Sequence, residues 1–457
     1  MFGKDSWEDY KKEEKKQVMD FADDYKKFLS KGKTERECVK LSIELAEKNG
    51  FKDISKYNYL KAGDKVYITN KGKNIALVII GQKPIEEGIH VLGAHIDSPR
   101  LDLKQNPLYE KTGFALFDTH YYGGIKKYQW VTIPLAMYGV VCKKDGTTVD
   151  INIGDNKNDP VFGVSDLLIH LSSEQMTKPG TKLIEGEALD LIVGSIPLKD
   201  KDSDKDPVKN NILKILNKKY GIEEEDFLSA EIEIVPAGEA RDYGLDSSMI
   251  AGYGHDDRSC AYSSIRALID QGECEYTTVA VLVDKEEIGS VGATGAQSKW
   301  FENTIAELIN LTDTYTDLKL RHAMQNTKML SSDVSAGIDP IYTSVSDKEN
   351  AAYLGNGICF NKYTGARGKS GCNDAMPEYF AKIRRILDDE NCHYQTAELG
   401  KVDQGGGGTI AYILGNYNMY VIDAGIAVLN MHAPMEIISK ADLYEAYKSY
   451  KVFLKNI

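Results

Sequence analysis

Short apolar runs that alternate with amphipathic helical patterns recur along most of this 457-residue chain. Runs of this kind, bounded by turn-forming residues, are typical of buried strands, and the segments between them repeat apolar residues at helical spacing. The strands expected on this basis include 89–94, 278–283, 308–311 and 419–422, and the helices include 258–270 and 373–387. Strands that alternate with helices predict an α/β fold with helices on both faces of its sheet.

A hairpin is expected near the start of this pattern. Asn70-Lys71-Gly72-Lys73 separates two apolar runs, at 65–69 and 75–81, and carries the residue types that tight turns favour. A hairpin brings antiparallel neighbours into the sheet. We therefore expect a mixed sheet of the α/β class.

The pattern changes in the middle of the chain, where short β-rich segments replace long helices. These segments are 130–141, 147–153 and 230–235. We expect an α/β sheet domain in two parts, 1–103 and 242–457, separated by an inserted β-rich domain at 104–241. An inserted domain of this kind is most simply explained as an assembly element.

The composition excludes several classes of function. Lys and Arg total 56 against 69 Asp and Glu, and the net charge of -13 repels nucleic acid and anionic membrane surfaces. Seven scattered cysteines without any Cys-x-x-Cys pair argue against a disulfide framework and against a thiolate zinc site. Residues 1–33 lack an apolar signal segment, and no run elsewhere is long enough to span a membrane. We expect a cytoplasmic protein.

Two consecutive carboxylates, Glu286 and Glu287, follow the apolar run that ends at Val283. Adjacent side chains at a strand end can point to different sides, so one carboxylate could hold a metal while the other deprotonates a water beside it. Most Glu-Glu pairs are only solvated surface. The interpretation of this pair therefore depends on the rest of the sequence.

Four other segments place His or Asp at the end of an apolar run or at the start of a helix. Each has a simple structural explanation, such as helix capping, a turn, or a core histidine with its hydrogen bonds satisfied. Together they supply oxygen and imidazole ligands without thiolate, which suits a two-zinc hydrolase, with manganese or cobalt as alternatives. The candidates are His95, Asp97, Asp256, Asp257, Asp333 and His432.

The spacing of these residues suggests individual roles for some of them. His95 and Asp97 are two residues apart on one strand face, so the carboxylate can fix the tautomer of a ring that binds metal. Either Asp256 or Asp257 could bridge two metal ions, and the residue pattern does not choose between them.

The local motifs resemble those of the aspartyl aminopeptidase and aminopeptidase I family of dinuclear zinc metallopeptidases. The resemblance covers essentially the whole chain, and it implies a fold of the zinc exopeptidase type. It also implies a metal-dependent aminopeptidase that releases single N-terminal amino acids from peptides. The motifs that carry it are Gly93-Ala94-His95-Ile96-Asp97-Ser98-Pro99-Arg100-Leu101, Asp284-Lys285-Glu286-Glu287-Ile288-Gly289-Ser290, Ser332-Asp333-Val334 and Asn430-Met431-His432.

The same resemblance implies two zinc ions per subunit and a role for each motif residue. In this assignment Asp97 orients a zinc ligand, Glu286 is the general base that activates the bridging water, and the peptide bond after the bridging aspartate is cis. The implied ligands are His95 and Asp333 for one zinc, Glu287 and His432 for the other, and Asp256 as the bridge.

Two further segments bear on assembly and specificity. Asp166-Leu167-Leu168-Ile169-His170-Leu171 resembles the segment whose histidine reaches into a neighbouring subunit's active site; the alternative is a histidine on an apolar strand packed in a core. The resemblance implies a homo-oligomer, in which dimers built through the inserted β-rich domain join into a closed tetrahedral dodecamer that admits peptides and not folded proteins. In the segment 360–369, Lys362 could bind an acidic substrate side chain. The sequence of this segment differs, however, from that of family members that prefer an N-terminal Asp or Glu.

Two other functions are compatible with the same ligands. A carboxypeptidase or deacylase with a co-catalytic zinc pair is one alternative, because metal ligands do not determine which end of a peptide binds. A scaffold that has kept the fold without activity is the other. The presence of every expected ligand and of Glu286 favours an enzyme.

Overall fold

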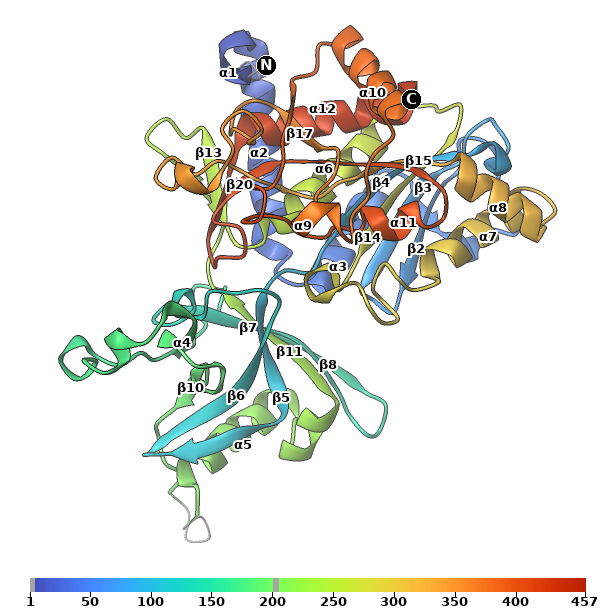
Figure 1. The fold of residues 1–457 in the computed structure, drawn as a ribbon. Coiled ribbons are helices and arrows are strands. Elements are labelled where there is room, and N and C mark those ends of the chain that lie inside the picture. The colour runs from blue at the N-terminus through green and yellow to red at the C-terminus, as the bar shows by residue number, and fades with distance from the viewer. Residues whose placement is uncertain (1–4, 200–204) are drawn as a thin grey trace. The chain divides into compact units, whose positions relative to one another are not determined.

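A computed structural model describes residues 5–199 and 205–457 of the chain (Figure 1). The chain forms two compact units, of which the first is Met1–Asp97, Ala240–Met431 and Glu436–Ile457 and the second is Ser98–Glu239 and His432–Met435. The second unit therefore includes a short segment near the C-terminus that no sequence pattern indicated.

A nine-stranded sheet forms the centre of the first unit. Its strands in spatial order are β1 (Lys52–Asp53), β2 (Lys65–Asn70), β3 (Asn74–Ile79), β14 (Thr277–Val283), β4 (Ile89–His95), β15 (Lys328–Ser331), β19 (Tyr420–Gly425), β17 (Ile358–Asn361) and β18 (Tyr394–Thr396). The four strands β14, β4, β15 and β19 are parallel, whereas β3 and β17 run antiparallel to their neighbours β14 and β19. The sheet is mixed, as the hairpin between β2 and β3 predicts.

Helices cover both faces of this sheet, because its strands are apolar on both sides. In β14, Ala280 and Leu282 belong to one buried apolar cluster, while Val279 and Val281 belong to another. The helices of the first cluster are α2 (Lys12–Lys31), α3 (Glu35–Lys48), α6 (His255–Asp270), α10 (Pro377–Asp389) and α12 (Lys440–Asn456). Those of the second are α7 (Trp300–Thr312), α8 (Asp317–Asn326) and α11 (Ala411–Gly415), and the unit also contains the short helices α1 (Ser6–Asp9) and α9 (Ala366–Lys369).

The strand expected at 308–311 is wrong. These residues form the last turns of α7, which buries Phe301, Ile305, Leu308 and Ile309 against the sheet. The buried positions recur at helical spacing when the whole segment from Trp300 is considered. A short apolar run alone does not distinguish a strand from the buried part of a helix.

A second, five-stranded sheet in the first unit leads the chain into α6. Its strands in spatial order are β12 (Arg241–Tyr243), β13 (Met249–Gly252), β21 (Glu436–Ser439), β20 (Ala427–Leu429) and β16 (Ser335–Ala336). β13 and β21 are antiparallel, and Gly252 lies opposite Glu436. This pairing brings the start of α6 beside a segment that is far away in the sequence.

The second unit contains a seven-stranded antiparallel sheet, which fits the β-rich character of this part of the sequence. Its strands in spatial order are β8 (Thr148–Ile153), β7 (Leu135–Cys142), β11 (Ala230–Pro236), β5 (Arg100–Lys111), β6 (Phe114–Tyr122), β10 (Leu191–Gly194) and β9 (Gly163–Val164). Its helices are α4 (Gly180–Leu183) and α5 (Pro207–Tyr220). In the described part of the chain, no helix of either unit is long and apolar enough to cross a membrane.

Candidate metal centre

The carboxyl ends of three parallel strands bring the candidate ligands together in the first unit. Val283 at the end of β14 is paired with His95 at the end of β4, and Ser331 of β15 is paired with Gly93. The segments that follow β14 and β15 therefore leave the sheet at the same edge, where open α/β sheets commonly bind their ligands. The backbone of Asp333 approaches Gly425 of β19 so closely at this edge that a side chain at position 425 would overlap it.

Three overlapping sets of side chains at this edge are close enough to hold metal ions. Within each set, the possible ligand atoms all lie within 4.8 Å of one another. The sets are His95, Glu286 and Asp333; His95, Asp256 and Glu287; and Asp256, Asp257 and Asp333. They contain four of the five residues expected to bind metal, together with the expected base.

The ring of His95 faces different partners on its two nitrogens. Its Nε2 atom lies 3.1 Å from Asp256 Oδ1 and 3.9 Å from both Glu286 Oε2 and Asp333 Oδ1. Its Nδ1 atom lies 3.2 Å from Asp97 Oδ1. A carboxylate on one ring nitrogen and oxygen ligands around the other is the usual environment of a metal-binding histidine.

Asp97 also fixes the turn that carries the Glu286–Glu287 pair. One of its carboxylate oxygens accepts a hydrogen bond from the backbone N–H of Glu286 at 3.2 Å, and the other accepts from the N–H of Glu287 at 3.2 Å. The turn begins at Lys285, whose φ of 69° lies in the left-handed region. One carboxylate thus connects His95 to the two glutamates; the contact with His95 was expected from the sequence, whereas no sequence pattern indicated the contacts with the glutamates.

Asp256 and Asp257 face different parts of His95. The Asp256 carboxylate lies beside the ring, whereas Asp257 Oδ2 accepts a hydrogen bond from the His95 backbone N–H at 3.3 Å. Asp257 Oδ1 is buried and accepts no hydrogen bond from any residue that the structure describes. The peptide bond between the two aspartates is cis, as expected. The position of Asp256 supports its choice as the bridging ligand.

The charge balance of the site fits a bound cation. Burial raises the pKa of Asp333 well above its usual range, and the neighbouring carboxylate of Asp257 raises it further. Burial alone would lower the pKa of His95, but its hydrogen bonds to Asp256 and Asp97 raise that pKa well above its usual value. Carboxylate and imidazole donors without thiolate suit zinc. The donor set therefore fits a divalent metal that neutralises the buried carboxylates.

Comparison with known proteins identifies the family. Residues 28–454 match the family described as aminopeptidase I zinc metalloprotease (M18). This chain belongs to the M18 family. A Clostridium acetobutylicum protein, named probable M18 family aminopeptidase 1, is 60% identical over 99% of this chain and 98% of its own length. Several relatives with this name are 45% or more identical to the chain. The chain is therefore a zinc metalloaminopeptidase, which is a hydrolase.

Solved M18 structures share the whole fold. The crystal structure of aminopeptidase I from Clostridium acetobutylicum matches with a TM-score of 0.93 and 58% identity over 99% of both chains. The crystal structure of an M18 aminopeptidase from Thermotoga maritima matches with a TM-score of 0.95 and 44% identity over 100% of both chains. The yeast mApe1 dodecamer, 20% identical over 96% of this chain and 97% of its own with a TM-score of 0.77, shares the fold alone. The expected α/β fold is confirmed.

Two site residues expected from the M18 resemblance lie in the second unit. His432 has its ring Nδ1 2.8 Å from the carbonyl oxygen of Gly124, and it belongs to none of the three sets of described residues above. His170 lies in a short 3₁₀ turn, Ile169–Leu171, and is exposed. The alternative that His170 is packed on a core strand is therefore wrong. The metal role of His432 stays a prediction.

Lys362 carries a surface ion pair in this M18 chain. Its ammonium lies 3.7 Å from Asp374 Oδ1, and its side chain is 45% exposed. An exposed pair of this kind contributes about 0 to 1 kcal/mol and leaves the lysine well solvated. This position favours the solvated interpretation over a role in reading an acidic substrate.

We therefore expect Lys362→Ala to slow the hydrolysis of Asp and Leu arylamides by similar factors, each below about threefold, because only a solvated surface charge is removed. The kcat/KM values of the two substrates, measured for the variant and the parent, check this. A loss confined to substrates with N-terminal Asp or Glu would return Lys362 to the specificity pocket.

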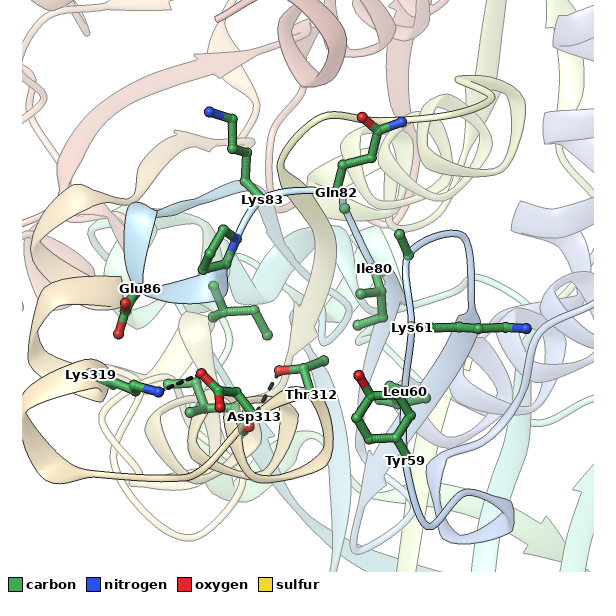
Figure 2. A pocket seen from close by; sticks show the side chains of 15 residues that line it. Tyr59, Leu60, Lys61, Ile80, Gln82, Lys83, Glu86, Thr312, Asp313 and Lys319 are labelled. Carbon is green, nitrogen blue, oxygen red and sulfur yellow. Dashed lines mark hydrogen bonds and ion pairs between the residues drawn. The ribbon is translucent and has the colours of Figure 1, made fainter.

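A separate cavity of about 270 Å³ lies at the opposite edge of the nine-stranded sheet (Figure 2). It includes Ile80, directly after the Ile79 that pairs with Thr278 at the amino end of β14. Lys319 forms an ion pair with Asp313 at its wall, 2.5 Å apart. None of the candidate metal ligands lines this cavity, so it is separate from the metal centre.

A buried carboxylate outside the metal centre, Asp423 of β19, gives the chain a pH-dependent term in its stability. Its Oδ1 atom accepts a hydrogen bond from Thr409 Oγ1 at 2.6 Å, and burial raises its pKa from 3.8 to about 6. The folded state therefore binds the Asp423 proton more tightly than the unfolded state. The unfavourable term is small at low pH and grows as pH rises from about 4 to 6.

We expect Asp423→Asn to remove this term while its amide oxygen still accepts from Thr409. The gain in free energy of unfolding, relative to the parent, should be about 2 kcal/mol larger at pH 8 than at pH 4.5. Urea denaturation of both proteins at the two pH values measures the difference. An equal effect of the substitution at both pH values would contradict a raised pKa for Asp423.

Proposed function

We propose that this chain releases single amino acids from the N-termini of peptides with a water activated between two zinc ions and Glu286 as the general base. One observation carries this proposal. The Asp97 carboxylate lies beside His95 Nδ1 and also accepts from the backbone N–H groups of Glu286 and Glu287. A metal-binding ring, a metal-binding carboxylate and a base are thereby held by one buried group.

The proposed ligands follow the M18 pattern, and their number per subunit is part of the proposal. The close approach of Asp256 and Asp333 to the Nε2 atom of His95 supports three of them. Zinc bound there would supply Lewis acidity, which lowers the pKa of water and polarises a carbonyl group. The ligands would be His95 and Asp333 for one zinc, Glu287 and His432 for the other, and Asp256 between them.

Glu286 and Glu287 have different tasks in this proposal although they are neighbours. The backbone N–H groups of both residues donate hydrogen bonds to the Asp97 carboxylate, so the two side chains cannot exchange positions without breaking these contacts. Glu287 would act as a ligand. Glu286 would accept a proton from the attacking water and then give it to the amine that leaves, so that the carboxylate is regenerated after each cycle.

The assignment of the substrate's end is tested with matched peptides. One peptide is supplied with a free amine, with an acetylated N-terminus, and with an amidated C-terminus, and the released products are identified by mass spectrometry. We expect N-terminal residues to be released from the free-amine and the C-amidated forms only. Release from the C-terminus, or turnover of the acetylated form, would favour a related carboxypeptidase or deacylase.

We further propose that the second unit builds a homo-oligomer, a tetrahedral dodecamer formed from dimers, and supplies His170 to a neighbouring active site. The residues around His170 support an interface there. Leu168 is 53% exposed, Ile169 69% and Leu171 68%, which is unusual for three large apolar side chains within four residues. The dodecamer described for yeast mApe1 offers a precedent in the same fold.

A further inference from the structure

We propose that Glu436 is a positioning residue of the metal centre, which holds the backbone of Asp256 so that its carboxylate faces His95. This inference rests on the proposed role of Asp256 as a ligand. Glu436 is 1% exposed, and its Oε2 atom accepts a hydrogen bond from the Asp256 backbone N–H at 3.0 Å. The Asp256 carboxylate in turn lies 3.1 Å from the His95 ring. Glu436 therefore acts on the centre through Asp256.

The surrounding sheet fixes where the Glu436 carboxylate can be. Glu436 is the first residue of β21 and lies opposite Gly252 of β13, three positions before α6 begins at His255. A Cβ atom at Gly252 would lie 2.7 Å from Leu29 Cδ2 and 3.5 Å from His255 Nε2. The segment 252–256 is thus closely packed at Gly252, and the backbone N–H at its other end, that of Asp256, donates to Glu436.

The contact also satisfies a buried donor at the irregular start of α6. Asp256 and Asp257 do not have helical backbone angles, so the regular hydrogen bonding of α6 does not extend to the buried N–H of Asp256, and a carboxylate is a favourable acceptor for that N–H. The hydrogen bond is charge-assisted, and it is shielded from water because both groups are buried. It therefore resists competition from solvent, as a group that fixes a ligand must.

The residue beside Asp256 also has a buried hydrogen-bond partner. His255 has its ring Nδ1 2.7 Å from the hydroxyl group of Tyr25. Burial, followed by the charge of Glu436, raises the pKa of Tyr25 well above its usual value. Glu436 thus belongs to a buried group that surrounds the first residues of α6.

The test measures metal binding without turnover. Groups that orient ligands typically contribute about 10- to 100-fold to metal affinity. We expect Glu436→Met, which keeps the volume but cannot accept a hydrogen bond, to weaken zinc affinity by that factor in competition with a chromophoric chelator. It should also change the visible absorption spectrum of the cobalt-loaded protein. Glu436→Gln keeps an acceptor oxygen and should restore the affinity to within about threefold of the parent.

Asp442→Asn is the matched control. Asp442 is another fully buried carboxylate of the first unit, and it accepts from the backbone N–H groups of Gly355 at 2.8 Å and Gly357 at 2.7 Å. Its substitution should lower the melting temperature of the protein and leave zinc affinity and the cobalt spectrum unchanged. This outcome would separate a positioning role from a general effect of removing a buried carboxylate.

The failures of this inference and of the proposed ligand set are distinguishable. Asp256→Asn with parental zinc affinity would overturn the ligand assignment itself. Weak binding by Asp256→Asn together with parental affinity and spectrum in Glu436→Met would overturn only the role of Glu436. Failure of Glu436→Met to fold, judged by circular dichroism, would assign Glu436 a structural role and would also overturn the proposal.

Discussion

Glu286→Gln is expected to lower kcat by about 10²- to 10⁴-fold or more and to leave the bound metal unchanged. The amide has the shape of the carboxylate but cannot accept the proton of the attacking water. The backbone N–H of residue 286 still donates to Asp97 in the variant, so the turn that carries Glu287 should persist. Initial rates with an aminoacyl arylamide give kcat, and elemental analysis after desalting gives the metal content per subunit.

A ligand substitution provides the contrast for this experiment. His432→Ala should lose metal, and activity should fall with it, because the resemblance places this ring on a zinc ion. Glu286→Gln and His432→Ala thus separate a base from a ligand by metal content and not by rate alone. Loss of metal in Glu286→Gln in proportion to its loss of activity would contradict the assigned roles, as would near-parental activity.

The strands that carry the site could be predicted from the sequence because each is short, apolar and followed by the polar residues of interest. The ends of β4 and β14 are examples, since Ile89–His95 and Thr277–Val283 contain the runs expected there. Burial on both faces makes such runs continuous, and continuous runs are easy to recognise. The error at 308–311 has the same origin, since a buried helix can also present a short continuous run.

The contacts that complete the site could not be predicted from local patterns. Glu436 binds the backbone of Asp256 across 180 positions of sequence, and Asp97 binds that of Glu286 across 189. Every residue except proline has a backbone N–H, so the identity of the donor residue does not reveal such a hydrogen bond. Only the fold brings these groups together, and the same holds for the return of residues 432–435 to the second unit.

Single-sequence motifs and structure therefore inform different parts of the chemistry. The motifs identify the side chains that can bind metal, because only a few types of side chain bind zinc. The structure shows which acceptors orient those side chains. The Asp97 carboxylate, for example, lies beside the His95 ring and accepts hydrogen bonds from two backbone N–H groups. Substituting Asp97 should consequently affect the ring and the turn together, which makes it a poor choice for isolating either role.

His170→Ala is expected to lose turnover by about 10²-fold or more while metal content and assembly stay at parental values. The reason is that His170 is exposed on the second unit and carries no ligand role in the proposed centre. A group that enters the active site of a neighbour can be removed without disturbing the metal in its own subunit. Rate measurements, elemental analysis and light scattering test the three parts of this expectation.

Mixing two inactive proteins tests whether the site is shared. When His170→Ala and Glu286→Gln subunits exchange, a mixed pair contains one site with an intact Glu286 and an intact His170 from its neighbour. Random exchange of equal amounts should restore roughly a quarter of parental activity, because half of the pairs are mixed and each has one complete site. A fully active monomer, or mixtures that stay inactive after exchange has been demonstrated, would exclude a shared site and confine catalysis to the residues of one subunit.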